Sequence, residues 1–215
     1  MSLELMTLFI STFVTFFVLI DVVGVAPIFA TLTASGSANF RRSMAFKATF
    51  VAALIIFAFA FGGAWLLGHM GISIDAFRAA GGILLFLIAL DMVFEKRTER
   101  RDNRAEEILS NEQEGGKEED ISVFPIGIPM IAGPGTIAMA MLSMSHAESW
   151  LHKGVILAAL GGNLLIVLII FLLAGPLIRF MGDSVAAALT RILGVILAAM
   201  SVQLLIDGIK GAFGL

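Results

Sequence analysis

Long uncharged apolar runs constrain this chain more than any other feature. Three of them extend from Ala48 to Ile74, from Ile121 to Ala147 and from Gly154 to Ile178. An α-helix rises about 1.5 Å per residue, so roughly 20 apolar residues cross about 30 Å of hydrocarbon. Only 14% of the 215 residues are charged, against about 25% in soluble domains. The sequence therefore excludes most soluble folds and indicates a protein of the bilayer.

Three further segments are apolar enough to span the membrane although each carries charge. They are Leu5 to about Phe29 with Asp21, Ala76 to Phe94 with Arg78 and Asp91, and Val185 to Ile206 with Arg191. The apolar blocks are continuous rather than alternating, which argues against a barrel. We therefore predict an all-α, polytopic membrane protein with six transmembrane helices. The net charge of -3 gives no argument for nucleic acid as a partner.

The distribution of Lys and Arg predicts the orientation of these helices. The first, third and fifth connections hold ten basic residues and the opposite side holds two. Basic loops favour the cytoplasm, so we expect both termini outside and a multi-pass protein of the inner (plasma) membrane. Glu4 replaces the basic start of a secretory signal, so the first helix is expected to be retained.

A charged segment, residues 95–120, divides the chain into three-helix halves, 1–94 and 121–215. It holds ten acids and six bases and is expected to be a solvated cytoplasmic linker, with a regulatory docking site as the alternative. The second half then enters the membrane from the opposite side. Arg78-Ala79-Ala80-Gly81 resembles Arg191-Ile192-Leu193-Gly194, by chance or by duplication. Two inverted repeats are a construction typical of secondary transporters.

Three prolines and three glycines between Pro125 and Gly135 predict that helix four is broken, because interior prolines remove backbone donors. After Pro129, a half-helix following Gly133-Pro134-Gly135 would present free amides and its positive dipole end, which suits a carboxylate. Thr136 could add a hydroxyl group. The alternative is a kink that only shapes packing.

Helix one carries the related stretch Asp21, Gly24 and Pro27, and is also predicted to be broken. A carboxylate within a span is costly and is a candidate for function. Asp21 could carry a coupling proton or help to bind a cation, or it could cap the half-helix after the bend at Gly24 to Pro27.

Four further polar residues are candidates for substrate binding. Arg78 and Arg191 could bind an anionic group, or they could extend to the interface as arginines near helix ends commonly do. Asn163 and Gln203 could be ligands or interhelical hydrogen-bond partners.

Catalytic motifs are absent from the sequence, so we do not expect an enzyme. His69, His146 and His152 form no metal-ligand spacing and there is no cysteine, so neither a metal site nor a cofactor is expected. Uphill movement of a solute would need an ion gradient or an exchanged solute, since no P-loop is present.

The chain resembles the MarC family of six-helix membrane proteins. The resemblance rests on Gly24-Val25-Ala26-Pro27, on Ala76 to Leu85, and most specifically on Pro125-Ile126-Gly127-Ile128-Pro129 through Gly133-Pro134-Gly135. The family usually has a proline where this chain has Val22, so helix one is expected to be less sharply broken than helix four. The resemblance implies an architecture related to small amino-acid exporters of the LysE type.

Some members of that family are described as transporters of small neutral amino acids, so the resemblance favours a secondary transporter of such a solute. An exporter of metabolites or toxic compounds is one alternative, and a nontransporting scaffold that uses the linker is another. The expected partners are membrane lipids, a small solute and a coupling ion, either proton or sodium. Whether the protein forms a homo-oligomer is left open.

Overall fold

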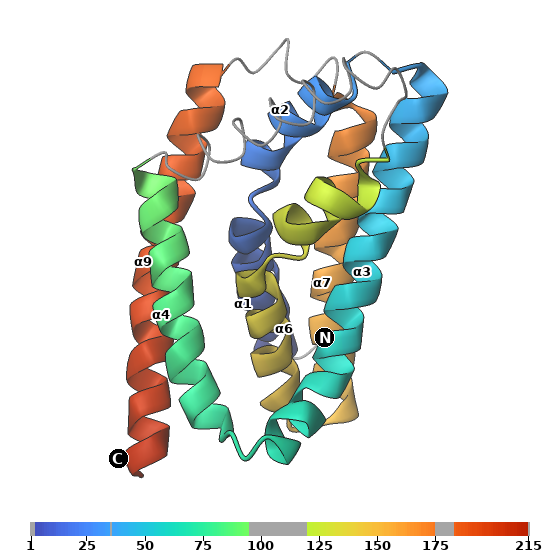
Figure 1. The fold of residues 1–215 in the computed structure, drawn as a ribbon. Helices are drawn as coiled ribbons and strands as arrows, with labels where there is room; N and C mark the ends of the chain where they lie inside the picture. The colour runs from blue at the N-terminus through green and yellow to red at the C-terminus, as the bar shows by residue number, and fades with distance from the viewer. Residues whose placement is uncertain (1–2, 35, 95–119, 175–182, 215) are drawn as a thin grey trace.

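The computed structural model describes residues 3–34, 36–94, 120–174 and 183–214 (Figure 1). These residues form helices and connecting segments, without β-strands. The predicted linker lies outside the described residues except for Asp120. The helices are α1 (Leu3–Ile20), α2 (Val22–Leu32), α3 (Ala38–His69), α4 (Ile74–Val93), η1 (Ser122–Ile131), α6 (Pro134–Ser145), α7 (Trp150–Leu172) and α9 (Asp183–Phe213).

Five of these segments are long and apolar enough to cross a membrane: α1 with α2, α3, α4, α7 and most of α9. The pair formed by η1 and α6 makes a sixth candidate span, bent by 58°. The prediction of an all-α polytopic membrane protein is confirmed, and so is the sharp break in helix four.

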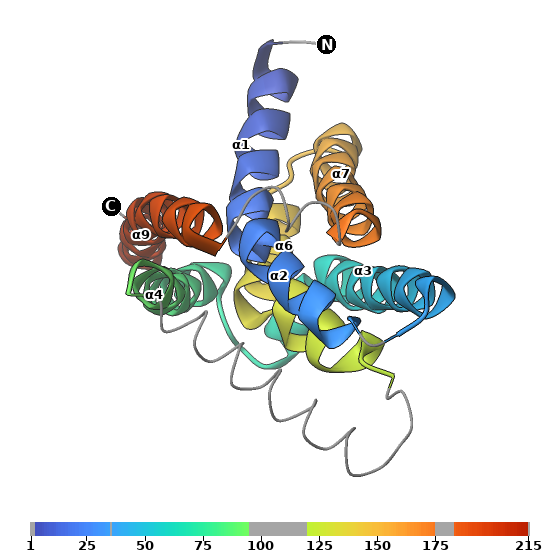
Figure 2. The same cartoon turned by 90° about the horizontal axis from the view of Figure 1, so that it is seen from above.

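The helices pack as two groups that meet along α1 and α6. α4 and α9 lie side by side along their length, at one edge of the molecule (Figures 1 and 2). In the other group, α1 packs on α7, and α3 packs on both η1 and α6. α2 lies across the end of the bundle opposite the α3–α4 connection and stacks Phe29 on Phe171 of α7, with 4.2 Å between the ring centroids.

The larger hydrophobic core gathers around α2, α3, η1 and α7, and a smaller one joins α1, α4 and α9. Aromatic residues such as Phe50 and Trp65 on α3 are largely exposed. In water such surface would favour aggregation, but in a bilayer the acyl chains cover it.

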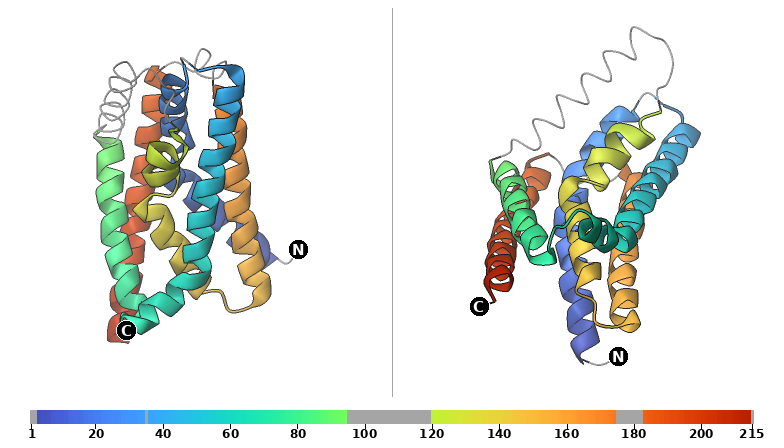
Figure 3. Two further views of the ribbon diagram at one scale, coloured as in Figure 1. Left: turned by 45° about the vertical axis from the view of Figure 1, so that its right-hand side comes forward. Right: turned by 60° about the horizontal axis from the view of Figure 1, so that its bottom comes forward.

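The connections sort to two ends of the bundle. The α3–α4 and α6–α7 connections and the C-terminal end of α9 lie at one end, and the α2–α3 connection lies at the other (Figures 1 and 3). We call the first the C-terminal end of the bundle. α1 is tilted, so that its N-terminal end projects from the side of the bundle (Figure 2).

Candidate functional site

The break in helix four is built from the proline and glycine cluster. η1 is a wide-turned helix in which Phe124 and Ile128, each preceding a cis-bonded proline, have extended rather than helical backbone. Pro129 is therefore accommodated inside η1. α6 then begins at Pro134, with Gly133 as its N-cap, which is slightly earlier than the sequence indicated.

At the start of α6, Gly133, Gly135 and Thr136 are buried, whereas Pro134 is exposed. A Cβ atom on Gly135 would lie 2.7 Å from Leu85 Cδ2, 3.0 Å from Ile88 Cδ1 and 3.5 Å from Leu19 Cδ2. Thr136 is 2% exposed. The amide groups expected to face a solute are thus packed between α1 and α4, and the breaks of helices one and four are closed in this conformation.

The break in helix one falls at Asp21, not after Gly24 to Pro27 as predicted. Asp21 has left-handed backbone, with φ 53° and ψ 56°, and it is the N-cap of α2. Its Oδ1 accepts from the Gly24 amide at 3.3 Å. Pro27 lies inside α2. α2 begins before the expected bend because the Asp21 side chain stabilises its first turn. Asp21 therefore caps a half-helix, as one of its two predicted roles had it, but this helix starts at Val22 rather than after Pro27.

Asp21 is fully buried, and α9 reaches it. Thr190 Oγ1 donates to Asp21 Oδ1 at 3.3 Å. Arg191 follows Thr190 on α9 and has an exposed side chain. The capping carboxylate therefore joins the break of helix one to the last helix.

Asn163 forms a hydrogen bond between two helices, which is one of the two roles predicted for it. It is fully buried on α7, and its Nδ2 donates to Phe13 O of α1 at 3.0 Å and to Ala159 O at 2.9 Å. Gln203 is exposed on α9, and its Nε2 donates to Asp207 Oδ1 at 2.8 Å.

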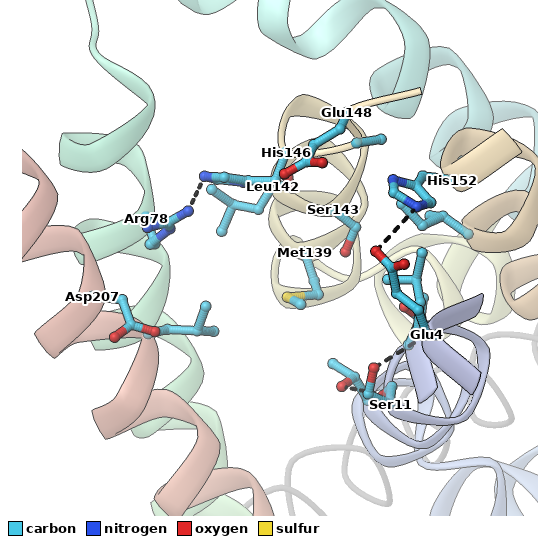
Figure 4. A pocket seen from close by; sticks show the side chains of 16 residues that line it. Glu4, Ser11, Arg78, Met139, Leu142, Ser143, His146, Glu148, His152 and Asp207 are labelled. Carbon is cyan, nitrogen blue, oxygen red and sulfur yellow. Dashed lines mark hydrogen bonds and ion pairs between the residues drawn. The ribbon is translucent and has the colours of Figure 1, made fainter. Parts of the chain in front are cut away.

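A polar pocket of about 510 Å³ opens between the two helix groups at the C-terminal end of the bundle (Figure 4). We call it the polar pocket. Arg78 is the predicted site residue that lines it. Hydroxyl groups line its α1 and α6 walls, from Ser11, Thr12, Thr15 and Ser143. Its charged and imidazole side chains are Glu4, Arg78, His146, Glu148, His152 and Asp207.

Two contacts between helices cross the polar pocket. Arg78 of α4 contacts His146 Nε2 at the end of α6, and its Nη1 lies 3.7 Å from Asp75 Oδ1 on its own helix. On the opposite wall, His152 Nε2 of α7 lies 3.8 Å from Glu4 Oε1 of α1. Figure 4 shows both contacts. The pocket therefore holds both signs of charge within one space.

The sequence analysis missed most residues of this pocket, since it considered the histidines only as possible metal ligands and did not single out Glu4, Glu148 or Asp207 as site residues. One signal was present. The predicted orientation puts the termini and the second and fourth connections on one side, so the polar groups near them share that side. Which of these polar side chains lie close together depends on how the helices pack, and helix packing cannot be predicted from local sequence.

At the other end of the bundle, an ion pair joins α3 to the last residue of the charged segment. Lys47 Nζ of α3 lies 2.8 Å from Asp120 Oδ2, and Asp120 Oδ1 accepts from the Ser122 amide at 3.0 Å. The Lys47 ammonium and the Ser122 hydroxyl lower the pKa of the Asp120 carboxyl group. Asp120 thus stays ionised and holds the start of η1 against α3.

The fold and the pocket define an α-helical integral membrane protein with an open polar pocket between its helices. The chain belongs to the MarC family, because the model of the MarC family integral membrane protein matches residues 6–213. The resemblance stated from the sequence motifs is confirmed.

Curated relatives agree with this assignment. A UPF0056 membrane protein of Methanocaldococcus jannaschii is 37% identical over 95% of this chain and 97% of its own length. UPF0056 membrane protein YhcE of Escherichia coli is 33% identical over 94% of this chain and 91% of its own. YvbG of Bacillus subtilis is 32% identical over 95% of each. These names state no activity or substrate. No solved structure matches the chain.

Proposed function

We propose that this membrane protein is a secondary transporter of a small neutral amino acid or a similar small zwitterionic solute. The polar pocket carries this proposal. A zwitterion needs a cation for its carboxylate and an anion for its ammonium group. Arg78 supplies the first, and Glu4, Glu148 and Asp207 supply the second from other walls of the same pocket. Its volume of about 510 Å³ lies in the range of about 300–1,000 Å³ usual for small-molecule sites.

The broken helices support a gating role. The pocket opens at the C-terminal end of the bundle, while Leu19, Leu85 and Ile88 enclose the start of α6. In this proposal the conformation is open on one side and closed at the breaks, and exposure of Gly133, Gly135 and Thr136 belongs to the opposite state. Irregular backbone at membrane depth is tolerated where protein buries it.

We further propose that the two halves are inverted repeats. α1 packs on α7 much as η1 and α6 pack on α3, and α4 pairs with α9. Inverted repeats place a site near the bilayer midplane and allow alternating access. Basic residues such as Arg41 and Arg42 favour the cytoplasm for the α2–α3 connection, which turns the polar pocket toward the outside of the inner membrane.

Uptake by purified protein in sealed liposomes tests this proposal. We expect saturable entry of radiolabelled glycine or alanine. Arg78→Gln should reduce its initial rate at low substrate about tenfold or more, because hydrogen bonds to charged groups contribute about 1.5–3 kcal/mol. Lys153→Gln is the matched control, since Lys153 lies over the Trp150 ring and does not line the polar pocket. Absence of uptake for every small amino acid would overturn the proposal.

A further inference from the structure

The contact between Arg78 and His146 fixes which imidazole nitrogen carries the proton. His146 Nδ1 lies 2.8 Å from Leu142 O. A carbonyl oxygen only accepts hydrogen bonds, so Nδ1 bears the hydrogen. Nε2 then has a free lone pair, and it accepts from Arg78 Nη2. Neutral His146 is therefore the acceptor that holds the Arg78 guanidinium against the end of α6.

Protonation of His146 removes that acceptor. Imidazolium has hydrogen on both nitrogens, so Nε2 would face the guanidinium as a second cation and donor. Asp75 Oδ1 would remain near Arg78 Nη1, from which it lies 3.7 Å away. The Nη2 edge of Arg78 and the Nε2–H of His146 would then both require an anion between them.

The other ionisable groups of the pocket are arranged around this pair. On α1 and α7, Glu4 and His152 face each other across the opposite wall (Figure 4). On α9, the Asp207 carboxylate accepts from Gln203. Glu148 lines the pocket in the connection that follows His146. A solute carboxylate drawn to Arg78 would thus leave its ammonium group within a pocket lined by these acids.

We propose that Arg78 and His146 form a subsite that binds a carboxylate together with one proton. The proton comes from water and enters at His146 Nε2. The carboxylate then replaces His146 as the acceptor of Arg78 and also accepts from Nε2–H, and loss of the proton releases it. Guanidinium groups suit carboxylates because they can donate two parallel hydrogen bonds. The inference rests on the proposed transport function and names the proton, rather than sodium, as its coupling ion.

Proton uptake on binding can be measured directly by calorimetry of the full chain in detergent. Alanine and propionate serve as probes, since propionate has the carboxylate without the ammonium group. Titrations at about pH 7.5, where histidine is ordinarily mostly neutral, are repeated in buffers of different ionisation enthalpy. We expect both probes to take up close to one proton per molecule bound, and both to bind more tightly at lower pH.

Histidine variants assign the proton to a residue. In His146→Gln, binding should be weaker and should take up no proton. In His69→Gln the uptake should persist, because His69 contacts Trp65 on α3 and does not line the pocket. Binding without proton uptake in the unsubstituted protein, or uptake lost in His152→Gln and kept in His146→Gln, would overturn the inference. So would failure of both probes to bind.

The two proposals fail separately. Transport in liposomes without proton uptake on binding would leave the transporter proposal standing and exclude the subsite. Proton-linked binding of propionate and alanine without transport in liposomes would retain the subsite and exclude the transporter.

Discussion

Asp21 combines three properties at one residue: a left-handed backbone, complete burial and a capping contact. Non-glycine residues seldom adopt positive φ, and Asp and Asn do so more readily than others. Its Oδ1 serves the Gly24 amide at 3.3 Å and the Thr190 hydroxyl, also at 3.3 Å. The side chain therefore holds the start of α2 and attaches it to α9.

Substitutions at Asp21 separate capping from charge. Asp21→Ala removes the N-cap and the oxygen that accepts from Gly24 and Thr190, and it places alanine at positive φ. Loss of a cap costs about 0.5–2 kcal/mol, so we expect a melting temperature lower by about 1–8 °C, measured on protein in detergent. Asp21→Asn keeps an acceptor oxygen and tolerates this backbone, so its melting temperature and its alanine uptake should stay close to those of the unsubstituted protein. A stable but inactive Asp21→Asn would instead give the negative charge a role in transport.

These residues show what could be predicted from sequence. Proline and glycine act on their own backbone, so the cluster from Pro125 to Gly135 predicted a break that the structure confirms. A carboxylate inside an apolar span marked Asp21 as a candidate for function or capping. Whether the helix breaks at Asp21 or nearer Pro27 depended on which backbone amide the Asp21 side chain could reach. The meeting of Arg78 with His146 could not be predicted, because it depends on how α4 and α6 pack.

At the scale of elements, the pairing of α4 with α9 depends on glycines that let backbones touch. A Cβ on Gly208 would lie 2.5 Å from Ala79 N and 2.8 Å from Asp75 O, and one on Gly82 would lie 2.7 Å from Leu205 N. Small residues at helix contacts are common in membranes because packing, rather than exclusion of water, holds the helices together. This pair carries both Asp75 with Arg78 and the Asp207 wall of the polar pocket.

Gly208→Ala should therefore lower the stability of the protein and weaken binding in the polar pocket. The added methyl group meets backbone atoms that cannot rotate away, and overpacking of this kind costs about 1–3 kcal/mol. We expect a lower melting temperature together with weaker alanine binding. Gly62→Ala on α3 is the matched control, because nothing lies within 4 Å of a Cβ there, and it should be neutral or slightly stabilising. Equal melting temperatures for the two variants would show that α4 and α9 do not pack so closely.

At the scale of the whole molecule, one end of the bundle is open and the breaks are closed. Ser143 lines the polar pocket, and Thr136, two turns earlier on the same helix, is 2% exposed at the start of α6. The chain contains no cysteine, so single cysteines report on these places without background. The pocket and the breaks can be compared along one helix in the same membrane.

A membrane-impermeant thiol reagent applied to intact cells should label Ser143→Cys much faster than Thr136→Cys, because only the first faces the open pocket. Added alanine should slow labelling of Ser143→Cys by occupying that space. Two connections fix the side from which the reagent enters. Ile72→Cys, between α3 and α4, should react in intact cells, whereas Ala34→Cys, between α2 and α3, should react only after the cells are permeabilised. The reverse order at these two connections would turn the polar pocket toward the cytoplasm. Equal labelling at Thr136→Cys and Ser143→Cys would mean that the break in helix four is already open to the same side.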